Sequence, residues 1–580
     1  MNLSAIELQV MWNRLIAVVE EQAQALIRTA FGTATREAGD LSAGVFLPDG
    51  RMIAQAVTGT PGHVNSMANS VYHFLRVFPA ATMKPGDVYV TNDPWMGTGH
   101  YWDFTVVTPT FRNGEAVALF ACTCHVVDIG GVGLGVESRQ VYHEGLAVPI
   151  MRLADANGLN ESLMQIVRAN VREPVQVEGD IYSLIACNDV GVRRLSAMLE
   201  EFAIDRLETL GTYIIDQSRA AMLKAIGQLP RGTWRYAMRM DGLEAPIDLA
   251  CALTVDDDGI TVDFAGTSGM SSWAINVPIC YTEAYASFGV QCIVAPGVPN
   301  NAGTLGTVRV TAPVGSILNA PRPAPVASRH MVGQMLPDMV FGCLFQAIPD
   351  RVPAEGTSCL WNLRLSGGPG LPDVEPAVLT KATPFNIVAF HSGGVGARPT
   401  KDGLSATAFP SGVRNVPIEV TEALTPLVFW RKEYRTDSGG AGTTRGGLGQ
   451  VMVLENGEGM PFALSATFDR MVHPPRGRIG GLSGMTGRLT TTGGRTLRGK
   501  GRQSIMAGDR LVVEFPGGGG YGDPLARDPV LVAEDVRLEL VGVETARRDY
   551  GVVVDAVGVL DRAATDALRA SRRATKEAAE

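Results

Sequence analysis

Apolar residues recur at helical spacing near the start of the chain. A spacing of three to four residues places apolar side chains on one face of an amphipathic helix. This pattern predicts a helix over residues 5–31, and the same period predicts helices over residues 63–78, 195–229 and 281–294. The residues that form the first apolar face are Ile6, Val10, Leu15, Val18, Leu26 and Ala30.

Apolar and polar residues alternate in other segments, which is typical of strands with one buried face. Residues 40–56 are predicted as a hairpin that turns at Pro48-Asp49-Gly50. Residues 103–131 are predicted as a second hairpin that turns at Asn113-Gly114, a pair that favours tight turns. The predicted fold is therefore α+β and multi-domain, with long helices and mixed, largely antiparallel sheets.

The last third of the chain is rich in glycine and predicted to be mostly β. Its glycines stand between recurring Val, Leu, Ile and Phe, which favours tight β turns over disorder. The stretch GGGGYG at 517–522 is followed at once by Asp523-Pro524, so the helix that a dinucleotide site needs cannot start there. The predicted parts are an α+β domain with the metal site (1–232), an α/β middle domain (233–430), a Gly-rich β domain (431–550) and a helical tail (551–580).

Composition narrows the class of protein. The chain has 580 residues, 46% of them hydrophobic, and a formal net charge of −9. An acidic chain is a poor partner for nucleic acid or an anionic membrane, so a soluble enzyme subunit acting on a small molecule is expected. The first residues lack the pattern of a signal peptide, and most of the eight cysteines stand singly among apolar residues, so we expect a cytoplasmic protein with reduced thiols.

Two short His-x-x-Asp patterns carry the candidate chemistry. They are His100 with Asp103, in HYWD, and His125 with Asp128, in HVVD, and both border the second hairpin. Imidazole and carboxylate donors together suit Mn²⁺, Zn²⁺ or Fe²⁺. Aromatic and aliphatic neighbours would desolvate the carboxylates, and a cation would offset that cost. The alternative is that both pairs are structural hydrogen bonds at strand ends.

Other residues in this region are secondary candidates. Asp40 opens a predicted strand and is either a metal ligand or a turn-capping residue. His143 and Glu144 are candidates for a general base. Cys122 and Cys124 share one face of a predicted strand, opposite His125, so they are interpreted as core residues. His63 and His73 are interpreted as core-edge or surface histidines.

Two common catalytic motifs are missing from the sequence. No G-x-x-x-x-G-K-[ST] phosphate loop and no G-x-S-x-G nucleophile elbow occurs. By motif, the chain therefore has neither an ordinary ATP-binding loop nor the nucleophile of a serine hydrolase.

Several ordered blocks resemble the hydantoinase B family over about residues 5–550. They include GDVYVTNDPWMGTGHYWDF, CHVVDIGG, YHEGLAVP, DSGGAGTTRGGLG and PGGGGYGDPLARDP. The resemblance implies a hetero-oligomer with a hydantoinase A type ATPase subunit, which binds ATP and Mg²⁺ and phosphorylates the substrate. The B-type subunit would then hydrolyse a cyclic amide, such as a hydantoin, oxoproline or lactam, at a divalent metal. Matching the motifs places the metal ligands at Asp40, His100, Asp103, His125 and Asp128.

The chain also departs from the family pattern. Many members read H-H-A-D where this chain has His125-Val126-Val127-Asp128, and G-G-T-H-L-P-D where it has residues 97–103. The lost histidine keeps two alternatives open. One is a subunit of an ATP-dependent ketone carboxylase, in which a small third subunit would be expected, and the other is a scaffold subunit without metal.

Overall fold

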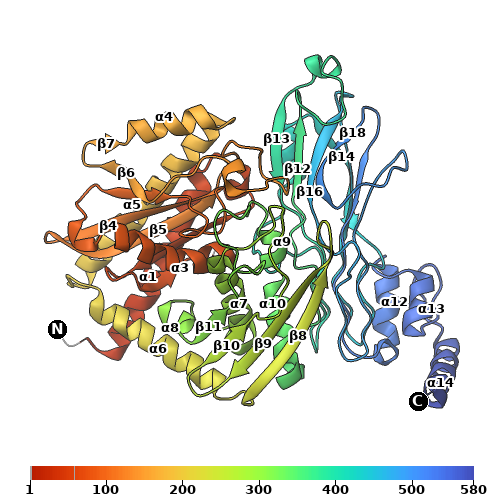
Figure 1. Cartoon of the computed structure of the whole chain (residues 1–580). Helices are drawn as coiled ribbons and strands as arrows, with labels where there is room; N and C mark the ends of the chain where they lie inside the picture. Colours follow the sequence, from red (N-terminus) through yellow and green to blue (C-terminus); the bar gives the residue numbers. More distant parts are fainter. Residues whose placement is uncertain (1–2, 58, 580) are drawn as a thin grey trace. The chain divides into compact units, whose positions relative to one another are not determined.

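The computed structural model describes residues 3–57 and 59–579, with side chains up to residue 575. The chain forms two compact units (Figure 1). The first unit comprises Met1–Met238, Asp248–Cys343 and Pro410–Val416. The second comprises Arg239–Ile247, Leu344–Phe409 and Pro417–Glu580. The four-part division expected from the sequence stays a prediction.

A seven-stranded antiparallel sheet forms the centre of the first unit. Its strand order is β2-β1-β5-β4-β3-β6-β7. The strands are β1 (Leu41–Phe46), β2 (Met52–Gln55), β3 (Val88–Thr91), β4 (Asp103–Arg112), β5 (Glu115–His125), β6 (Met151–Asp155) and β7 (Gly158–Leu159). Both predicted hairpins are present, as β1–β2 and β4–β5. Asn113 and Gly114 turn the second one with φ angles of 52° and 82°, the left-handed region that such tight turns require.

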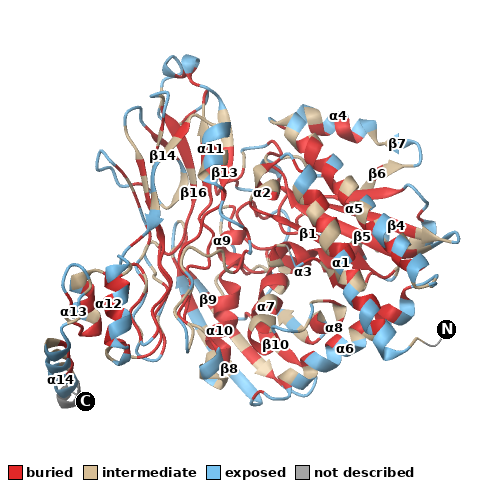
Figure 2. Cartoon of the chain, turned by 180° about the vertical axis from the view of Figure 1, so that it is seen from behind, coloured by how far each residue is buried: buried red, intermediate tan, exposed pale blue. Residues whose placement is uncertain are grey.

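Helices cover both faces of this sheet. The long helices α1 and α5 pack together on one face, whereas α3 packs on the other. Figure 2 shows β1, β4 and β5 largely buried, because neither face is left to solvent. The helices around the sheet are α1 (Ala5–Thr29), α2 (Thr33–Arg36), α3 (Pro61–Val77), η1 (Ala80–Thr82), η2 (Val141–His143), α4 (Glu161–Asn170), α5 (Pro174–Glu201) and α6 (Glu208–Ile226).

The helix predicted over residues 195–229 is in fact two helices. α5 already begins at Pro174, which occupies the first helical turn, where its missing N–H costs nothing. The helix ends at Glu201, and Ala203 adopts a positive φ of 51° that an α-helix cannot contain. α6 then starts at Glu208.

A smaller sheet of order β11-β10-β9-β8 completes the ordered strands of the first unit. β10 and β11 are parallel, and β9 and β10 are antiparallel. The strands are β8 (Gly232–Met240, its last residues in the second unit), β9 (Ile247–Val255), β10 (Ile260–Asp263) and β11 (Val308–Thr311). The remaining helices are α7 (Ile279–Val294), α8 (Ala302–Leu305), α9 (His330–Gly333) and α10 (Leu336–Ala347, which ends in the second unit).

The second unit contains two four-stranded antiparallel sheets, of order β13-β12-β16-β18 and β14-β15-β19-β17. Their strands are β12 (Leu363–Gly367), β13 (Phe385–Ala389), β14 (Leu427–Tyr434), β15 (Gln450–Asn456), β16 (Phe462–Thr467), β17 (Arg488–Thr491), β18 (Lys500–Ile505) and β19 (Leu511–Glu514). The helices are η3 (Pro349–Arg351), η4 (Val378–Lys381), α11 (Ile418–Leu424), η5 (Pro524–Ala526), α12 (Pro529–Arg537), α13 (Val543–Tyr550) and α14 (Arg562–Ala579). The predicted fold class is confirmed.

The sequence suggested tight turns in the glycine-rich segments, and one is present at Ile479-Gly480, where the φ angles are 50° and 84°. Other glycines of these segments serve a different purpose. Residues 517–520 run outside any strand or turn, and their neighbours are other backbones rather than side chains. A Cβ added to Gly447 would lie 2.0 Å from the carbonyl oxygen of Leu404, and one on Gly518 would lie 2.1 Å from that of Val395. The glycines are therefore required for close backbone packing. None of the described helices has the length and apolar character of a membrane span.

Candidate metal centre

Two strand ends bring the His-x-x-Asp segments together. Asp103 begins β4, His125 ends β5, and the antiparallel register places these two residues opposite each other. Partners in such a pair project from the same face of the sheet. The next pair on that face, Thr105 and Thr123, shares a hydrogen bond of 2.9 Å between their Oγ1 atoms. This is the face on which α3 packs.

The Asp103 carboxylate faces two imidazoles through Oδ1 and is completely buried. Its Oδ1 lies 2.8 Å from Nε2 of His100 and 3.1 Å from Nδ1 of His125. The two imidazole rings are adjacent, with centroids 5.2 Å apart. One ligand atom from each of these three residues lies within 4.8 Å of the others, which is compact enough to surround a single ion.

The hydrogen bonding of His100 leaves its Nε2 available to a metal ion. Its Nδ1 lies 3.0 Å from the carbonyl oxygen of Ala327, which can only accept a hydrogen bond, so Nδ1 carries the proton. Burial, followed by the charge of Arg329, lowers the pKa of His100 to about 3, so the ring is neutral. Nε2 then presents a lone pair toward a carboxylate oxygen and is a buried atom without a hydrogen bond.

Two lone pairs at 2.8 Å repel each other unless a cation lies beside both of them. A carbonyl that fixes the tautomer of a ligating histidine is a common feature of metal sites. Two imidazole nitrogens and a carboxylate oxygen are donors that suit Zn²⁺, Mn²⁺ or Fe²⁺. The residues present therefore fit a divalent ion.

The other oxygen of Asp103 is held by residues that the sequence did not single out. Oδ2 accepts hydrogen bonds from Oγ1 of Thr98 at 2.6 Å and from Nη2 of Arg329 at 2.7 Å. Arg329 also donates to the carbonyl of Thr98 and lies over the ring of Tyr281, 4.3 Å from its centroid. Burial alone would raise the pKa of Asp103, but the positive charges of His63 and Arg329 outweigh burial and hold the pKa well below its ordinary value. Asp103 is therefore an anion.

His63 is a further member of this site, although its sequence placed it at the core edge or surface. It lies in the first turn of α3, and its side chain is almost fully buried. Nε2 lies 3.1 Å from Oδ2 of Asp103, and Nδ1 lies 3.5 Å from Oδ1 of Asp40. Burial lowers its pKa, but the charges of Asp103 and Asp40 outweigh burial and raise the pKa above its ordinary value. The neighbouring Gly62 lets α3 pack closely against α7, because a Cβ there would lie 2.6 Å from the ring of Tyr285.

Asp40 lies beside the three-residue group rather than within it. Its Oδ1 accepts a hydrogen bond of 3.0 Å from Oγ1 of Thr60 and faces His63. Its carbonyl accepts a hydrogen bond from the backbone N–H of His125, so it is tied to the end of β5. The spacing of residues in the sequence did not reveal these contacts, because a turn-capping aspartate would occupy the same position.

The structure places Asp128 and His143 in other surroundings. The carboxylate of Asp128 accepts hydrogen bonds from the backbone N–H and the guanidinium of Arg172, and it is not a member of the three-residue group. His143 is exposed, and its Nδ1 accepts a hydrogen bond of 3.4 Å from the backbone N–H of Arg139.

Glu144 is fully buried and supports the loop behind His100. Its Oε1 accepts hydrogen bonds from the backbone N–H groups of Val326 at 2.6 Å and Ala327 at 2.9 Å. Burial raises the pKa of Glu144 to about 8, because the two N–H groups and Arg329 offset only part of the desolvation. Since the Ala327 carbonyl binds His100, Glu144 positions the candidate ligand indirectly.

Cys122 and Cys124 point away from this centre, as their strand positions predicted. Cys122 contacts the carbonyl of Leu184 on α5, which covers the opposite face of the sheet. Burial raises the pKa of both thiols well above the ordinary value, so neither is a thiolate ligand. All eight cysteines are free, and all but Cys292 are buried.

The chain is similar to known proteins in both sequence and fold. The caprolactamase subunit beta of Pseudomonas jessenii is 29% identical and is matched over 98% of this chain and 99% of its own length. The crystal structure of the ATP-dependent caprolactamase from the same organism superposes with a TM-score of 0.86 at 26% identity, covering 98% of this chain and 100% of that chain.

A nucleotide-free structure of acetone carboxylase is also similar in fold. It covers 99% of this chain and 84% of that chain, with a TM-score of 0.85 and an identity of 19%, which shows a common fold alone. The family model described as Hydantoinase B/oxoprolinase matches residues 4–524. This range contains the candidate metal centre and all strands of the two sheets in the second unit. The resemblance seen in the sequence is thus confirmed, and the chain belongs to the hydantoinase B/oxoprolinase family.

Proposed function

We propose that this chain is the metal-binding subunit of an ATP-dependent cyclic-amide hydrolase. The observation that carries the proposal is the buried group of His100, Asp103 and His125, with an unprotonated imidazole nitrogen aimed at a carboxylate oxygen. Membership of a family that includes an ATP-dependent caprolactamase supports the choice of substrate class.

His100, Asp103 and His125 would hold a divalent ion, with Asp40 and His63 beside it. When bound, such an ion lowers the pKa of water and polarises a carbonyl or phosphoryl oxygen. Arg329 and Thr98 keep Asp103 ionised and fixed in place through Oδ2, which leaves Oδ1 directed at the imidazoles. Asp128, which binds Arg172, and the exposed His143 are given no part in this step.

The remaining residues orient the ligands and exclude water. Glu144 fixes the peptide of Ala327 and thereby the tautomer of His100, so we assign it a positioning role. Trp102 and Tyr101 are buried next to His100 and lower the local polarity. His63, between two carboxylates, is the group best placed to hold a proton at Nδ1 or Nε2 and is our candidate for proton transfer.

We infer that a partner subunit supplies the energy of ATP. A hydantoinase A type ATPase, carrying ATP and Mg²⁺, would phosphorylate the amide oxygen and turn a poor electrophile into a good one. The name of the caprolactamase relative, a subunit beta, supports a hetero-oligomer. The unpaired cysteines support a cytoplasmic location.

The test is reconstitution of this chain with a hydantoinase A type ATPase subunit. Lactams, hydantoins and 5-oxoproline are supplied with ATP, and ring opening and ADP are measured before and after removal of metal with a chelator. The proposal expects substrate-dependent ADP release, coupled ring opening and recovery with a single added metal. ADP release that requires bicarbonate and a ketone would instead show a carboxylase subunit, and a purified chain without stoichiometric metal would show a scaffold.

A further inference from the structure

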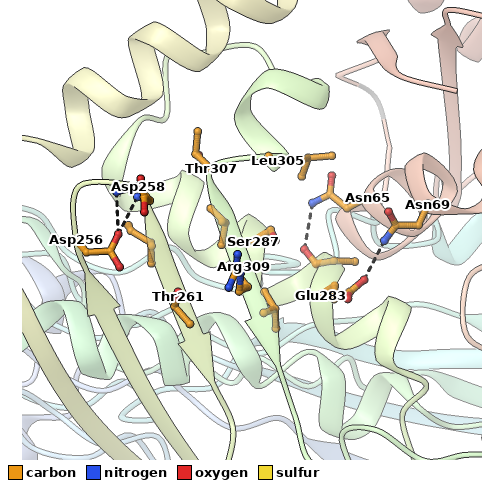
Figure 3. A pocket seen from close by; sticks show the side chains of 16 residues that line it. Asn65, Asn69, Asp256, Asp258, Thr261, Glu283, Ser287, Leu305, Thr307 and Arg309 are labelled. Carbon is orange, nitrogen blue, oxygen red and sulfur yellow. Dashed lines mark hydrogen bonds between the residues drawn. The ribbon is translucent and has the colours of Figure 1, made fainter. Parts of the chain in front are cut away.

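A second site lies in the first unit, apart from the residues of the metal centre. It is a cavity of about 470 Å³, a volume within the range of small-molecule sites. It is lined by α3, α7, β10, β11 and the turns before the two strands, and none of its lining residues belongs to the metal group (Figure 3). Its lining is mostly polar, and these polar groups take no part in the metal centre.

Arg309 supplies the positive charge of this cavity. It lies on β11 in register with Thr261 of β10, and both residues line the cavity. Arg309 makes no ion pair or side-chain hydrogen bond with any residue that the structure describes. Arginine offers a planar fork of N–H donors that matches a carboxylate. Its guanidinium is therefore available to an anionic group in the cavity.

Glu283 supplies a negative charge from a different element. It lies on α7, is partly buried, and its Oε2 accepts a hydrogen bond of 2.9 Å from Nδ2 of Asn69 on α3. No cation among the described residues pairs with it, and burial raises its pKa. A desolvated carboxylate with only an amide partner gains most from a bound ammonium group.

The wall between these charges is rigid and rich in hydrogen-bonding groups. Asn65 donates to the carbonyl of Ala284 at 3.1 Å, which joins α3 to α7. It also accepts from Nδ2 of Asn300, in the segment after α7, at 2.7 Å. Ser287 lies one helical turn after Glu283 and lines the same cavity. A preformed polar wall reduces the entropy lost when a small ligand binds.

The geometry points to a binding site for a small zwitterionic amino acid, with its carboxylate on Arg309 and its ammonium group on Glu283. An exposed arginine without an ion pair and a partly buried carboxylate, on separate elements within one cavity of small-molecule size, are the juxtaposition that carries this inference. The other carboxylates of the lining, Asp256 and Asp258, are exposed in the turn before β10. A ligand with only one of the two charges would leave the other side chain without a partner.

Both helices of this cavity also reach the metal centre. His63 and Asn65 lie two residues apart on α3, and Tyr281 and Glu283 lie two residues apart on α7, so each helix presents nearly opposite faces to the two sites. Opening of a lactam or of 5-oxoproline yields a carboxylate and an amine on one molecule, whereas opening of a hydantoin yields a carbamoyl amino acid without a free amine. The cavity would thus bind the product of such a reaction, and α3 and α7 would transmit this binding to the metal centre. This assignment of the ligand rests on the proposed function.

Binding is tested by calorimetry on the complete chain, without ATP or substrate. The probes are glycine, β-alanine, γ-aminobutyrate and ε-aminocaproate, with butanoate and butylamine as ligands of a single charge. We expect one zwitterion of the series to bind at one site per chain, and each single-charge ligand to bind at least about 10-fold more weakly. Arg309→Gln and Glu283→Gln should each lower the affinity for the zwitterion by about 10-fold or more.

Matched controls are Lys224→Gln and Glu200→Gln, which remove the same charges from exposed positions outside the cavity. They should leave the affinity unchanged. Absence of binding across the series, or binding that survives both cavity variants, would overturn the inference whatever the outcome of the reconstitution. Binding that persists in a chain without hydrolase activity would support the site and count against the proposed function alone.

Discussion

Replacement of Asp103 by asparagine is the sharpest test of the metal centre. The change keeps the shape of the side chain but removes the charge that His100, His125, His63 and Arg329 surround. It also places an amide N–H₂ where one carboxylate oxygen now accepts hydrogen bonds, so donors face donors.

The expected cost follows from burial and from the number of partners. Asp103 is 0% exposed and Arg329 is 4% exposed, so the substitution leaves a cation without a counter-ion in a dry site. Removing one member of a buried ion pair costs about 3–5 kcal/mol of the free energy of unfolding. Loss of a residue that merely orients a ligand weakens metal binding about 10–100-fold, and loss of a ligand should exceed that.

Urea unfolding and metal titration against a competing chelator measure these two effects. Asp128→Asn is the matched control, because Asp128 is equally buried but binds the partly exposed Arg172 instead of the imidazoles. It should retain the metal affinity of the unaltered chain. The reasoning would fail if Asp103→Asn kept its metal and lost less than about 1 kcal/mol, or if Asp128→Asn lost its metal as well.

Three further outcomes are expected. His63→Asn should weaken metal binding about 10–100-fold, because it removes a contact to Asp103; unchanged affinity in the chelator titration would remove His63 from the site. Gly447→Ala should lower the free energy of unfolding by about 1–3 kcal/mol, because its Cβ would meet a carbonyl oxygen at 2.0 Å. Gly297→Ala, with open space around its Cβ, should change the stability little, and equal losses in both variants would contradict the packing argument. Burial raises the pKa of Glu355, but the charges of Arg470 and Arg476 outweigh burial and lower the pKa from 4.5 to about 2. Its stabilisation, about 3 kcal/mol, is present above pH 4.5 and lost as the pH falls toward 2; Glu355→Gln should flatten this part of the unfolding profile, and an unchanged slope would refute the assignment.

Local patterns predicted much of the secondary structure. The helix expected over residues 5–31 is α1, from Ala5 to Thr29, and the expected helical tail (551–580) contains α14, from Arg562 to Ala579. Asn113-Gly114 correctly marked the turn between β4 and β5. The break between α5 and α6 was missed, because residues 202–207 contain neither proline nor glycine, the residues that most strongly interrupt a helix.

The glycine-rich segments show where local reasoning fails. Glycine relieves strain at a positive φ and also lets two backbones approach closely, and the sequence alone does not tell these uses apart. At Gly447 and Gly518 the neighbouring carbonyl oxygens belong to residues 404 and 395, which are distant in the chain. Only the folded unit reveals that contact.

The sequence by itself determined the family, the antiparallel hairpins and the presence of His100, Asp103 and His125 at the ends of two strands. The hairpins follow from periodicity and from short-range turn chemistry, which act within about ten residues. The family follows from its ordered motif blocks along the chain. The tertiary structure decided which polar groups share one dry site. It brought His63 and Arg329 to Asp103 and paired Asp128 with Arg172, because burial forces each charge to find a partner wherever the fold provides one.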